Sequence, residues 1–335
     1  MTRPRDLSTL IRVSQLYYEL GETQEAIARV LGITRPQESR LLKQARAEGV
    51  VEIRIVDRTE RPSAVADELS RRFNLKAVHV APTFVGSESL TRRRVGRLAA
   101  QVLVGAVRDG MTVGIGDGSS IAALADGMDG LQASAAATVV PLCGGFWGAT
   151  GGHEPYRRVA DAIGATAHGL LAPGLLDDPA TRDALAAHAG IRAVTSHWER
   201  LDVAAFGIGG PTWTEGAVGP EIMRDLARAG AIGEILISPF DIEGRFVGEA
   251  LRHRTIACEP RALAQAPTAI AVASGIAKIA PILGALRTGV MGVLVTDLEA
   301  AEGVLQLADS TSTGLPARSG QLVRAGGPTS PGGTA

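Results

Sequence analysis

The segment from Thr23 to Arg46 combines side chains that can contact nucleic acids. It reads TQEAIARVLGITRPQESRLLKQAR, and from Arg29 onward it holds five basic residues against one acidic residue. Arginine and glutamine can read base edges through paired hydrogen bonds, whereas serine, threonine and lysine more often hold phosphates. The positions expected to face DNA are Thr34, Arg35, Gln37, Ser39, Arg40 and Lys43. Charge alone would equally suit a solvated helix face.

The spacing of capping residues in this segment predicts a helix-turn-helix. Thr23 is a good N-cap for one helix, and Gly32 is suited to end it. Thr34 can cap the next helix, with Pro36 in its first turn, where a missing N–H does no harm. An amphipathic helix ending near Gly21 precedes the pair, and the alternating run VVEIRIV follows it as a short strand. These are the parts of a DNA-binding helix-turn-helix.

One residue disagrees with this pattern. Glu38 occupies a position where an apolar side chain usually packs between the two helices. Burial of an unpaired carboxylate costs several kcal/mol, so we expect Glu38 to be exposed or paired with a neighbouring Arg or Lys. A helix-turn-helix that has degenerated into a protein-interaction surface stays open as an alternative.

A second group of candidate residues surrounds a glycine-rich turn. The stretch GIGDGSS, residues 114–120, follows a predicted strand and begins a helix. Backbone N–H groups at a helix N-terminus, together with two hydroxyls, suit a phosphate or polyhydroxyl ligand. A tight turn without a ligand is the other interpretation. The stretch matches neither GxGxxG nor GxxxxGK[ST], so dinucleotide and nucleoside triphosphate binding are poorly supported.

Glycines also end two further predicted strands, Gly144 with Gly145 at one and Gly207, Gly209 and Gly210 at the other. In open α/β sheets the ligand crevice lies at the carboxyl ends of the strands, where these loops would gather. Metal binding is not expected, since the six histidines show no short ligand spacing with Cys or acidic partners.

The positions of these turns predict an α/β protein of more than one domain. The 335 residues are 45% hydrophobic but only 4% aromatic, which fits a core of Ala, Val, Leu and Ile. From Ala77 onward, strand-like runs alternate with helical ones, which predicts a doubly wound, mainly parallel sheet. The expected divisions are a helix-turn-helix domain over 1–57, a linker and connecting helix over 58–76, an effector domain over 77–315 and a flexible tail over 316–335.

Several classes of protein are disfavoured. No apolar stretch of about 18 residues exists, and the N-terminus has no signal-peptide core, so we expect a cytoplasmic protein without a membrane partner. The two cysteines, Cys143 and Cys258, form no disulfide framework, and Cys143 is expected to be a small buried thiol.

The chain resembles the SorC/DeoR-type sugar-binding transcriptional regulators. The resemblance begins at LYYELGETQEAIARVLGITRPQESRLLKQARAEGVVEIRI and covers essentially all of the chain except the tail. It continues in order through VGIGDGSSI, VVPLCGG, LLAPGLLDDPATRDAL, FGIGG, LARAGAIGEIL, VASGIAKIAPILGALRTG and VLVTDLEAAEGVL. Seven ordered segments together are specific.

The resemblance implies a transcriptional regulator of carbohydrate metabolism rather than an enzyme. It implies a fold similar to ribose-5-phosphate isomerase and glucosamine-6-phosphate deaminase, a double-stranded DNA operator, a sugar, polyol or sugar-phosphate effector, a homodimer or homotetramer, and no cofactor. The implied effector-site residues are Asp117, Gly118, Ser119, Ser120, Gly144, Gly145, Asp241 and Lys278. For Lys278 an ordinary solvated lysine, and for Asp241 a turn-forming role, are equally open.

That fold keeps a sugar-phosphate isomerase or deaminase with an accessory helical domain as an alternative. Deaminases of this fold place an Asp-Gly-His run after a Gly-Ile-Gly strand end, but this chain has GIGGPTWTEG there and has no such catalytic groups. A second departure is GEILISPFD, where relatives usually have Gly-Arg/His-Phe in place of Ile237, Ser238 and Pro239. Loss of a charge-assisted hydrogen bond, worth about 1.5 to 3 kcal/mol, favours an unphosphorylated effector.

Overall fold

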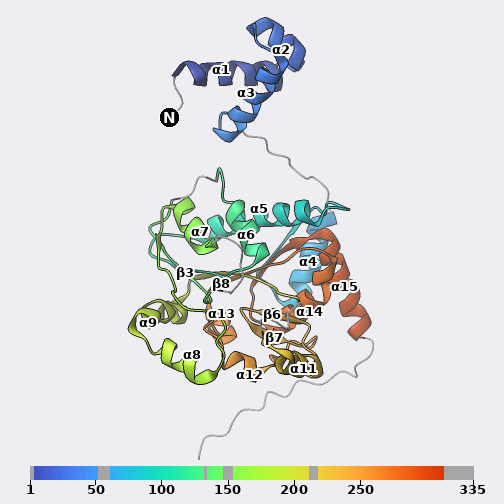
Figure 1. Ribbon diagram of the computed structural model, residues 1–335. Helices are drawn as coiled ribbons and strands as arrows, with labels where there is room; N and C mark the ends of the chain where they lie inside the picture. Colours follow the sequence, from blue (N-terminus) through green and yellow to red (C-terminus); the bar gives the residue numbers. More distant parts are fainter. Residues whose placement is uncertain (1–3, 52–60, 132–133, 146–153, 211–217, 313–335) are drawn as a thin grey trace, which may run out of the picture. The chain divides into compact units, whose positions relative to one another are not determined.

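The chain folds into two compact units in a computed structural model, Met1–Glu60 and Arg61–Ala335. The structure describes residues 4–51, 61–131, 134–145, 154–210 and 218–312 (Figure 1). Most of the predicted strand over 50–56 and all of the predicted tail lie outside these residues. No helix in the described ranges is long and apolar enough to cross a membrane.

The first unit is helical (Figure 1). Its elements are α1 (Pro4–Ser14), the π-helical turn η1 (Gln15–Glu19), α2 (Gln24–Leu31) and α3 (Arg35–Ala47). Val13, Ile27 and Leu42 form its buried core, one side chain from each α-helix. Because each helix is too short to be stable alone, this shared apolar face holds the unit together.

The turn between α2 and α3 follows from its capping residues, as predicted. The Thr23 side chain accepts a hydrogen bond from the Ala26 N–H at 3.2 Å, which caps α2. Gly32 ends the helix at φ +63°, a left-handed conformation that glycine adopts without penalty. At the start of α3, Gln37 Oε1 accepts from the Thr34 N–H at 2.9 Å, which forms one half of a capping box.

The second unit is built on a seven-stranded sheet with the order β1-β9-β8-β5-β2-β3-β4, and every neighbouring pair is parallel. This confirms the predicted α/β fold. The strands are β1 (Ala77–Ala81), β2 (Thr112–Ile115), β3 (Thr138–Pro141), β4 (Thr166–Ala167), β5 (Val203–Gly207), β8 (Thr268–Val272) and β9 (Val293–Asp297). The central strands are buried on both faces, as helices on both sides require.

Helices cover both faces of the sheet. One hydrophobic core lies under α5 (Glu88–Ala106), α6 (Ser119–Asp126) and α7 (Pro155–Ile163). The other lies under α4 (Arg61–Phe73), α13 (Pro260–Gln265), α14 (Ile279–Thr288) and α15 (Leu298–Ser312). The shorter helices are α8 (Pro179–Ala186), α9 (Ala189–Thr195), η2 (Ser196–Arg200), α11 (Pro220–Arg228), α12 (Glu249–Arg252) and η3 (Ile276–Lys278).

A separate two-stranded antiparallel hairpin follows α11. It consists of β6 (Gly233–Ile235) and β7 (Ser238–Phe240), and its first strand also bridges to Gly209 just beyond β5. Gly209 donates to the Glu234 carbonyl at 2.9 Å, which fixes the hairpin against the end of the sheet. The hairpin therefore reaches over the carboxyl edge of the parallel strands.

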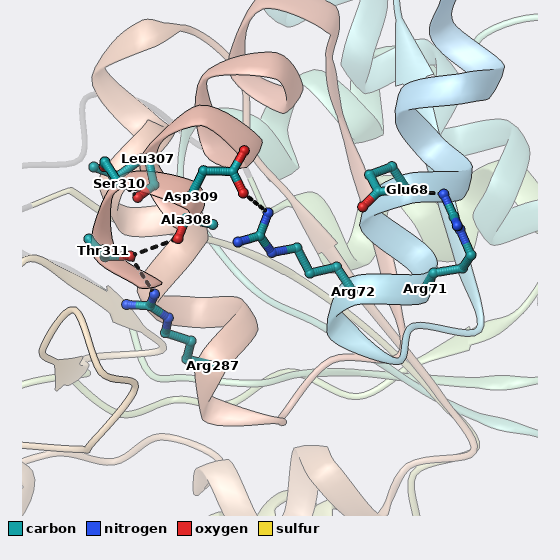
Figure 2. Close-up of polar contacts among 9 residues, drawn as sticks. All are labelled: Glu68, Arg71, Arg72, Arg287, Leu307, Ala308, Asp309, Ser310 and Thr311. Carbon is teal, nitrogen blue, oxygen red and sulfur yellow. Dashed lines mark hydrogen bonds and ion pairs between the residues drawn. The ribbon is translucent and has the colours of Figure 1, made fainter. Parts of the chain in front are cut away.

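Polar contacts attach α4 and α14 to the C-terminal turns of α15 (Figure 2). Arg72 of α4 pairs with Asp309, and Arg287 of α14 donates to Thr311 Oγ1 at 2.7 Å. Arg287 also donates to the Ile242 carbonyl at 2.8 Å, just beyond β7. One guanidinium thus connects α14 with the turn that follows the hairpin and with α15.

Candidate functional site

A cavity of about 260 Å³ lies at the carboxyl edge of the sheet, where the ends of β2 and β5 meet the β6–β7 hairpin. The chain passes outward from β2 to β3 and β4, then returns to the other side of β2 as β5. The strand order therefore reverses between β2 and β5, and ligands of open α/β proteins bind at such a switch point. The lining residues are Asp117, Gly118, Ser119, Ser120, Cys143, Gly207, Ile208, Gly209, Gly210, Glu234, Leu236, Ile237 and Lys278.

The loop after β2 brings four of the predicted residues to this cavity. Gly118 adopts φ +103°, which turns the chain sharply into α6, and its N–H donates to Asp117 Oδ1 at 2.7 Å. Ser119 and Ser120 form the first turn of α6, where backbone N–H groups have no partner within the helix. The wall thus offers hydroxyls, backbone donors at the positive end of a helix dipole and one carboxylate.

Glu234 is the polar residue that sequence reasoning missed. Its carboxylate Oε2 accepts the Ile237 N–H at 2.7 Å, and a Cβ placed on Gly209 would lie 1.9 Å from Oε1. Only glycine at position 209 leaves room for this carboxylate. Gly209 and Gly210 were therefore the feature of the sequence that could have indicated a side chain packed at this strand end. Burial raises the pKa of Glu234, although the Ile237 N–H and the nearby Lys278 charge lower it in part.

Lys278 is the one cationic side chain among the described residues that line the cavity. It sits at the N-terminal end of α14, and its Nζ lies 3.5 Å from where a Cβ on Gly210 would be. Burial lowers its pKa, while Glu234 and Glu88 act to raise it. Glu234 and Lys278 therefore attract each other across the cavity, and towards a polar ligand Glu234 is a hydrogen-bond acceptor and Lys278 a donor.

The cavity also has an apolar side. Leu236 and Ile237, at the tip of the hairpin, line it together with Ile208 and Cys143. Cys143 is buried as predicted, and burial, followed by the charges of Asp117 and Glu234, raises the pKa of its thiol. A neutral thiol of this kind is a small apolar contact rather than a nucleophile.

Three of the predicted effector residues are not brought to the cavity. Gly144 packs against residues 172–174, where a Cβ would lie 2.5 Å from backbone atoms, and Gly145 hydrogen-bonds to the same segment. The carboxylate of Asp241 is buried and accepts from Arg245, from N–H at 2.9 Å and from Nε at 2.7 Å. In the structure Asp241 therefore stabilises the turn after β7, which was its alternative role.

The candidate DNA-contacting residues lie on or beside α3. Arg35, Arg40 and Lys43 are exposed, as are Thr34 and Gln37, and Ser39 is half-buried. Gln37 has a second role, because its side-chain oxygen is engaged in the helix cap with Thr34. Arg35, Arg40 and Lys43 take no part in these hydrogen bonds of the helix cap.

The expectation for Glu38 is wrong. Its relative exposure is 0%, and both carboxylate oxygens have no hydrogen-bond partner among the residues that the structure describes. Burial raises its pKa, and the charge of Arg35 only partly opposes this. The packing of α3 on α1 and α2 requires this position to face inward, so helix register prevails over the preference of the carboxylate for water.

No group of three or more His, Cys, Asp or Glu side chains in the described parts of the chain is arranged to hold a metal ion. The described lining of the cavity offers hydroxyls, backbone N–H groups, two carboxyls, one ammonium and an apolar wall. Such a mixture suits a small polar organic molecule, held by a few directed hydrogen bonds.

Comparison with known proteins gives consistent results across the chain. Residues 57–306 match the family model Sugar-bind, which describes a sugar-binding domain. The sorbitol operon regulator of Klebsiella pneumoniae is 31% identical over 91% of this chain and 100% of its own. The erythritol catabolism regulatory protein EryD of Brucella abortus is 27% identical over 90% and 97% of the two chains. The crystal structure of the full-length Klebsiella regulator SorC matches with a TM-score of 0.69 at 31% identity, covering 90% of this chain and 99% of that one.

Proposed function

The chain belongs to the SorC/DeoR-type family of sugar-binding transcriptional regulators, and we propose that its effector binds in the cavity at the ends of β2 and β5. It is a regulator of carbohydrate metabolism genes controlled by a sugar-type effector. In this arrangement the side chains that line the cavity bind the effector, and α3 contacts the operator.

The observation that carries the effector assignment is the convergence of polar groups at the topological switch point. Asp117, Ser119, Ser120, Glu234 and Lys278 come from three separate segments of the chain and line one cavity. Hydroxyl groups of a sugar both donate and accept hydrogen bonds, so they can be satisfied by carboxylates and by an ammonium or N–H group at the same site.

The operator assignment rests on exposure and charge in α3. Arg35, Arg40 and Lys43 project into solvent from one helix of a capped helix-turn-helix. Arginine can form bidentate hydrogen bonds to guanine, and lysine holds phosphates. Gln37 is the weaker candidate for base contact because it would first have to leave the helix cap.

Regulation requires the effector to bind two arrangements of the protein with unequal affinity. We propose that the chain acts as a homodimer or homotetramer on a palindromic double-stranded operator, because paired half-sites need symmetric proteins. Effector binding would then change the spacing or orientation of the paired first units. This mode of regulation needs no cofactor.

A second candidate function follows from Glu234. A buried carboxyl group with a raised pKa beside a lysine is also what a general acid or base requires, so a sugar-phosphate isomerase remains the alternative. The similarity to proteins named as regulators over nine-tenths of the chain favours regulation. Turnover of a sugar phosphate that is abolished in Glu234→Gln would reverse this order.

The test is DNA binding to the upstream region of the gene itself, measured by fluorescence anisotropy at two salt concentrations. Pentoses, hexoses, polyols and their phosphates are added in turn. We expect salt-sensitive, sequence-specific binding that one compound alters, and loss of that response in Gly207→Leu. Gly207 lines the cavity, and a Cβ there meets nothing closer than 3.8 Å, so a side chain added at this position would take up space that the ligand needs. A full response in this variant would remove the cavity from the mechanism.

A further inference from the structure

The tip of the β6–β7 hairpin has an unusual backbone. Ile235 pairs with Ser238, so Leu236 and Ile237 form a two-residue loop, with φ values of +48° and +62°. Two-residue loops of this kind normally contain asparagine, aspartate or glycine, because both central residues need positive φ. Among the described residues, only Asn74 is another non-glycine residue with positive φ.

These two residues bear conformational strain for which the surroundings must compensate. A left-handed conformation is unfavourable for a residue with a Cβ, and a β-branched side chain is a particular outlier there. Both side chains are nonetheless buried, Leu236 at 7% and Ile237 at 2% relative exposure. Ile237 packs with Val218, Leu226 and Leu251, which holds the strained turn in place. Strain of this kind is concentrated at functional sites.

The strained turn fixes two opposite features of the cavity at once. Its side chains supply the apolar wall, while the Ile237 N–H holds the Glu234 carboxylate at 2.7 Å. A ligand that enters must therefore place C–H groups against Leu236 and Ile237 and polar groups against Glu234. Sugars and polyols have both kinds of surface.

We propose that the Leu236–Ile237 turn is the specificity determinant of the effector site, and that it selects an uncharged sugar or polyol over the phosphorylated compound. This inference rests on the proposed function, since it concerns the ligand of the same cavity. Ile237 is the central residue because it contributes both the apolar wall and the N–H that positions Glu234.

The charges around the cavity support an uncharged ligand. The described lining residues include two carboxyls, of Asp117 and Glu234, and one ammonium, of Lys278. A phosphate dianion would add negative charge to this set, and no arginine, the side chain that binds phosphate through two parallel hydrogen bonds, is among the described lining residues. Lys278 already interacts with Glu234 and with Glu88, so its charge is shared before a ligand arrives. Hydroxyl groups can donate to both carboxylates without adding charge.

The size of the cavity suits a small ligand. Its volume of about 260 Å³ lies below the range of roughly 300 to 1,000 Å³ that is typical of pockets for larger ligands. Replacement of Ile237 by glycine would enlarge the cavity and relieve the strained φ at the same time. The variant therefore removes the wall without requiring a new backbone conformation.

The test is calorimetric titration of the full-length protein with uncharged pentoses, hexoses and alditols, and with the phosphate of each compound. In the wild-type protein we expect one uncharged compound to bind at least about tenfold more tightly than its phosphate. In Ile237→Gly we expect that preference to fall to about threefold or less. Asn74→Gly is the matched control, because it relieves a left-handed non-glycine residue at an exposed position that does not line the cavity, and its preference should equal that of the wild type.

The outcomes separate this inference from the function on which it rests. Wild-type binding of a phosphate as tight as that of the parent sugar, lost in Gly207→Leu, would overturn the selectivity and leave the cavity as the effector site. An unchanged preference in a folded Ile237→Gly protein would also overturn it. Ligand binding that persists in Gly207→Leu, or no binding of any compound in the panel, would overturn both proposals. Circular dichroism of each variant establishes that it is folded.

Discussion

Replacement of Glu38 should stabilise the first unit. An unsatisfied buried group costs about 1 to 3 kcal/mol and more if it is charged, and the nearby Arg35 places this carboxylate toward the lower end. Glu38→Leu removes that penalty and adds roughly 1.5 to 3 kcal/mol of apolar burial in the core formed around Val13, Ile27 and Leu42. We therefore expect a gain of about 3 kcal/mol, whereas Glu38→Gln, which leaves an unsatisfied amide in the same place, should change stability by less than about 1 kcal/mol.

The assay is amide hydrogen exchange of the α3 segment in the full-length protein, followed by mass spectrometry. All three tryptophans, Trp147, Trp198 and Trp213, lie in the second unit, so their fluorescence would not report on this one. A gain of about 3 kcal/mol slows exchange from the globally opened first unit by about a hundredfold.

The stability difference between Glu38→Leu and the wild type should also change with pH, in a direction that follows from the pKa of Glu38. Because the pKa of Glu38 is raised in the folded state, its contribution to stability is fully present below the unfolded pKa and is lost as pH rises through the folded pKa. The advantage of Glu38→Leu over the wild type should therefore grow between about pH 4 and pH 7. Faster exchange in Glu38→Leu, or an advantage that shrinks with rising pH, would refute the assignment of Glu38 as a buried, unpaired carboxyl group.

Three other substitutions test the operator surface, the cavity and the second unit. Arg40→Ala should weaken operator binding and reduce the slope of log affinity against log salt by about 1 if it contacts a phosphate, measured by anisotropy. Gly209→Ala should displace the Glu234 carboxylate, since its Cβ would lie 1.9 Å from Oε1, and should lower effector affinity at least about tenfold by calorimetry. Arg287→Ala removes the hydrogen bonds to Ile242 and Thr311 and should destabilise the second unit by about 1 to 3 kcal/mol in urea, followed by tryptophan fluorescence.

Each of these substitutions has a matched control in the chain. Arg71→Ala removes an exposed arginine of the second unit and should leave operator affinity unchanged. Gly105→Ala adds a methyl group at an exposed position of α5, outside the cavity lining, where a Cβ meets nothing within 4 Å, so it should bind the effector normally. Arg228→Ala removes only a surface ion pair with Asp225 and should shift stability by less than about 1 kcal/mol. Equal effects in a variant and its control would contradict the corresponding prediction.

The sequence by itself determined the local structure and the order of the elements. Thr23, Gly32 and Thr34 set both ends of α2 and the start of α3, because caps and left-handed glycines act within four or five residues of the chain. The alternation of strands and helices after Ala77 specified a parallel sheet, since each apolar strand needs helices on both faces. The glycine-rich turn over 114–120 indicated part of the cavity, because a turn between a strand and a helix is also encoded by neighbouring residues.

Only the tertiary structure decided which polar groups meet. Glu234 joins the cavity because the β6–β7 hairpin bridges to Gly209, a contact between segments that no local pattern encodes. Asp241, seven residues further on, pairs with Arg245 instead, although its residue type suits a sugar equally well. The burial of Glu38 likewise follows from the packing of three helices rather than from its own preference for water. Short-range hydrogen bonds act between neighbours in the chain, whereas burial and pKa depend on what the folded chain brings alongside.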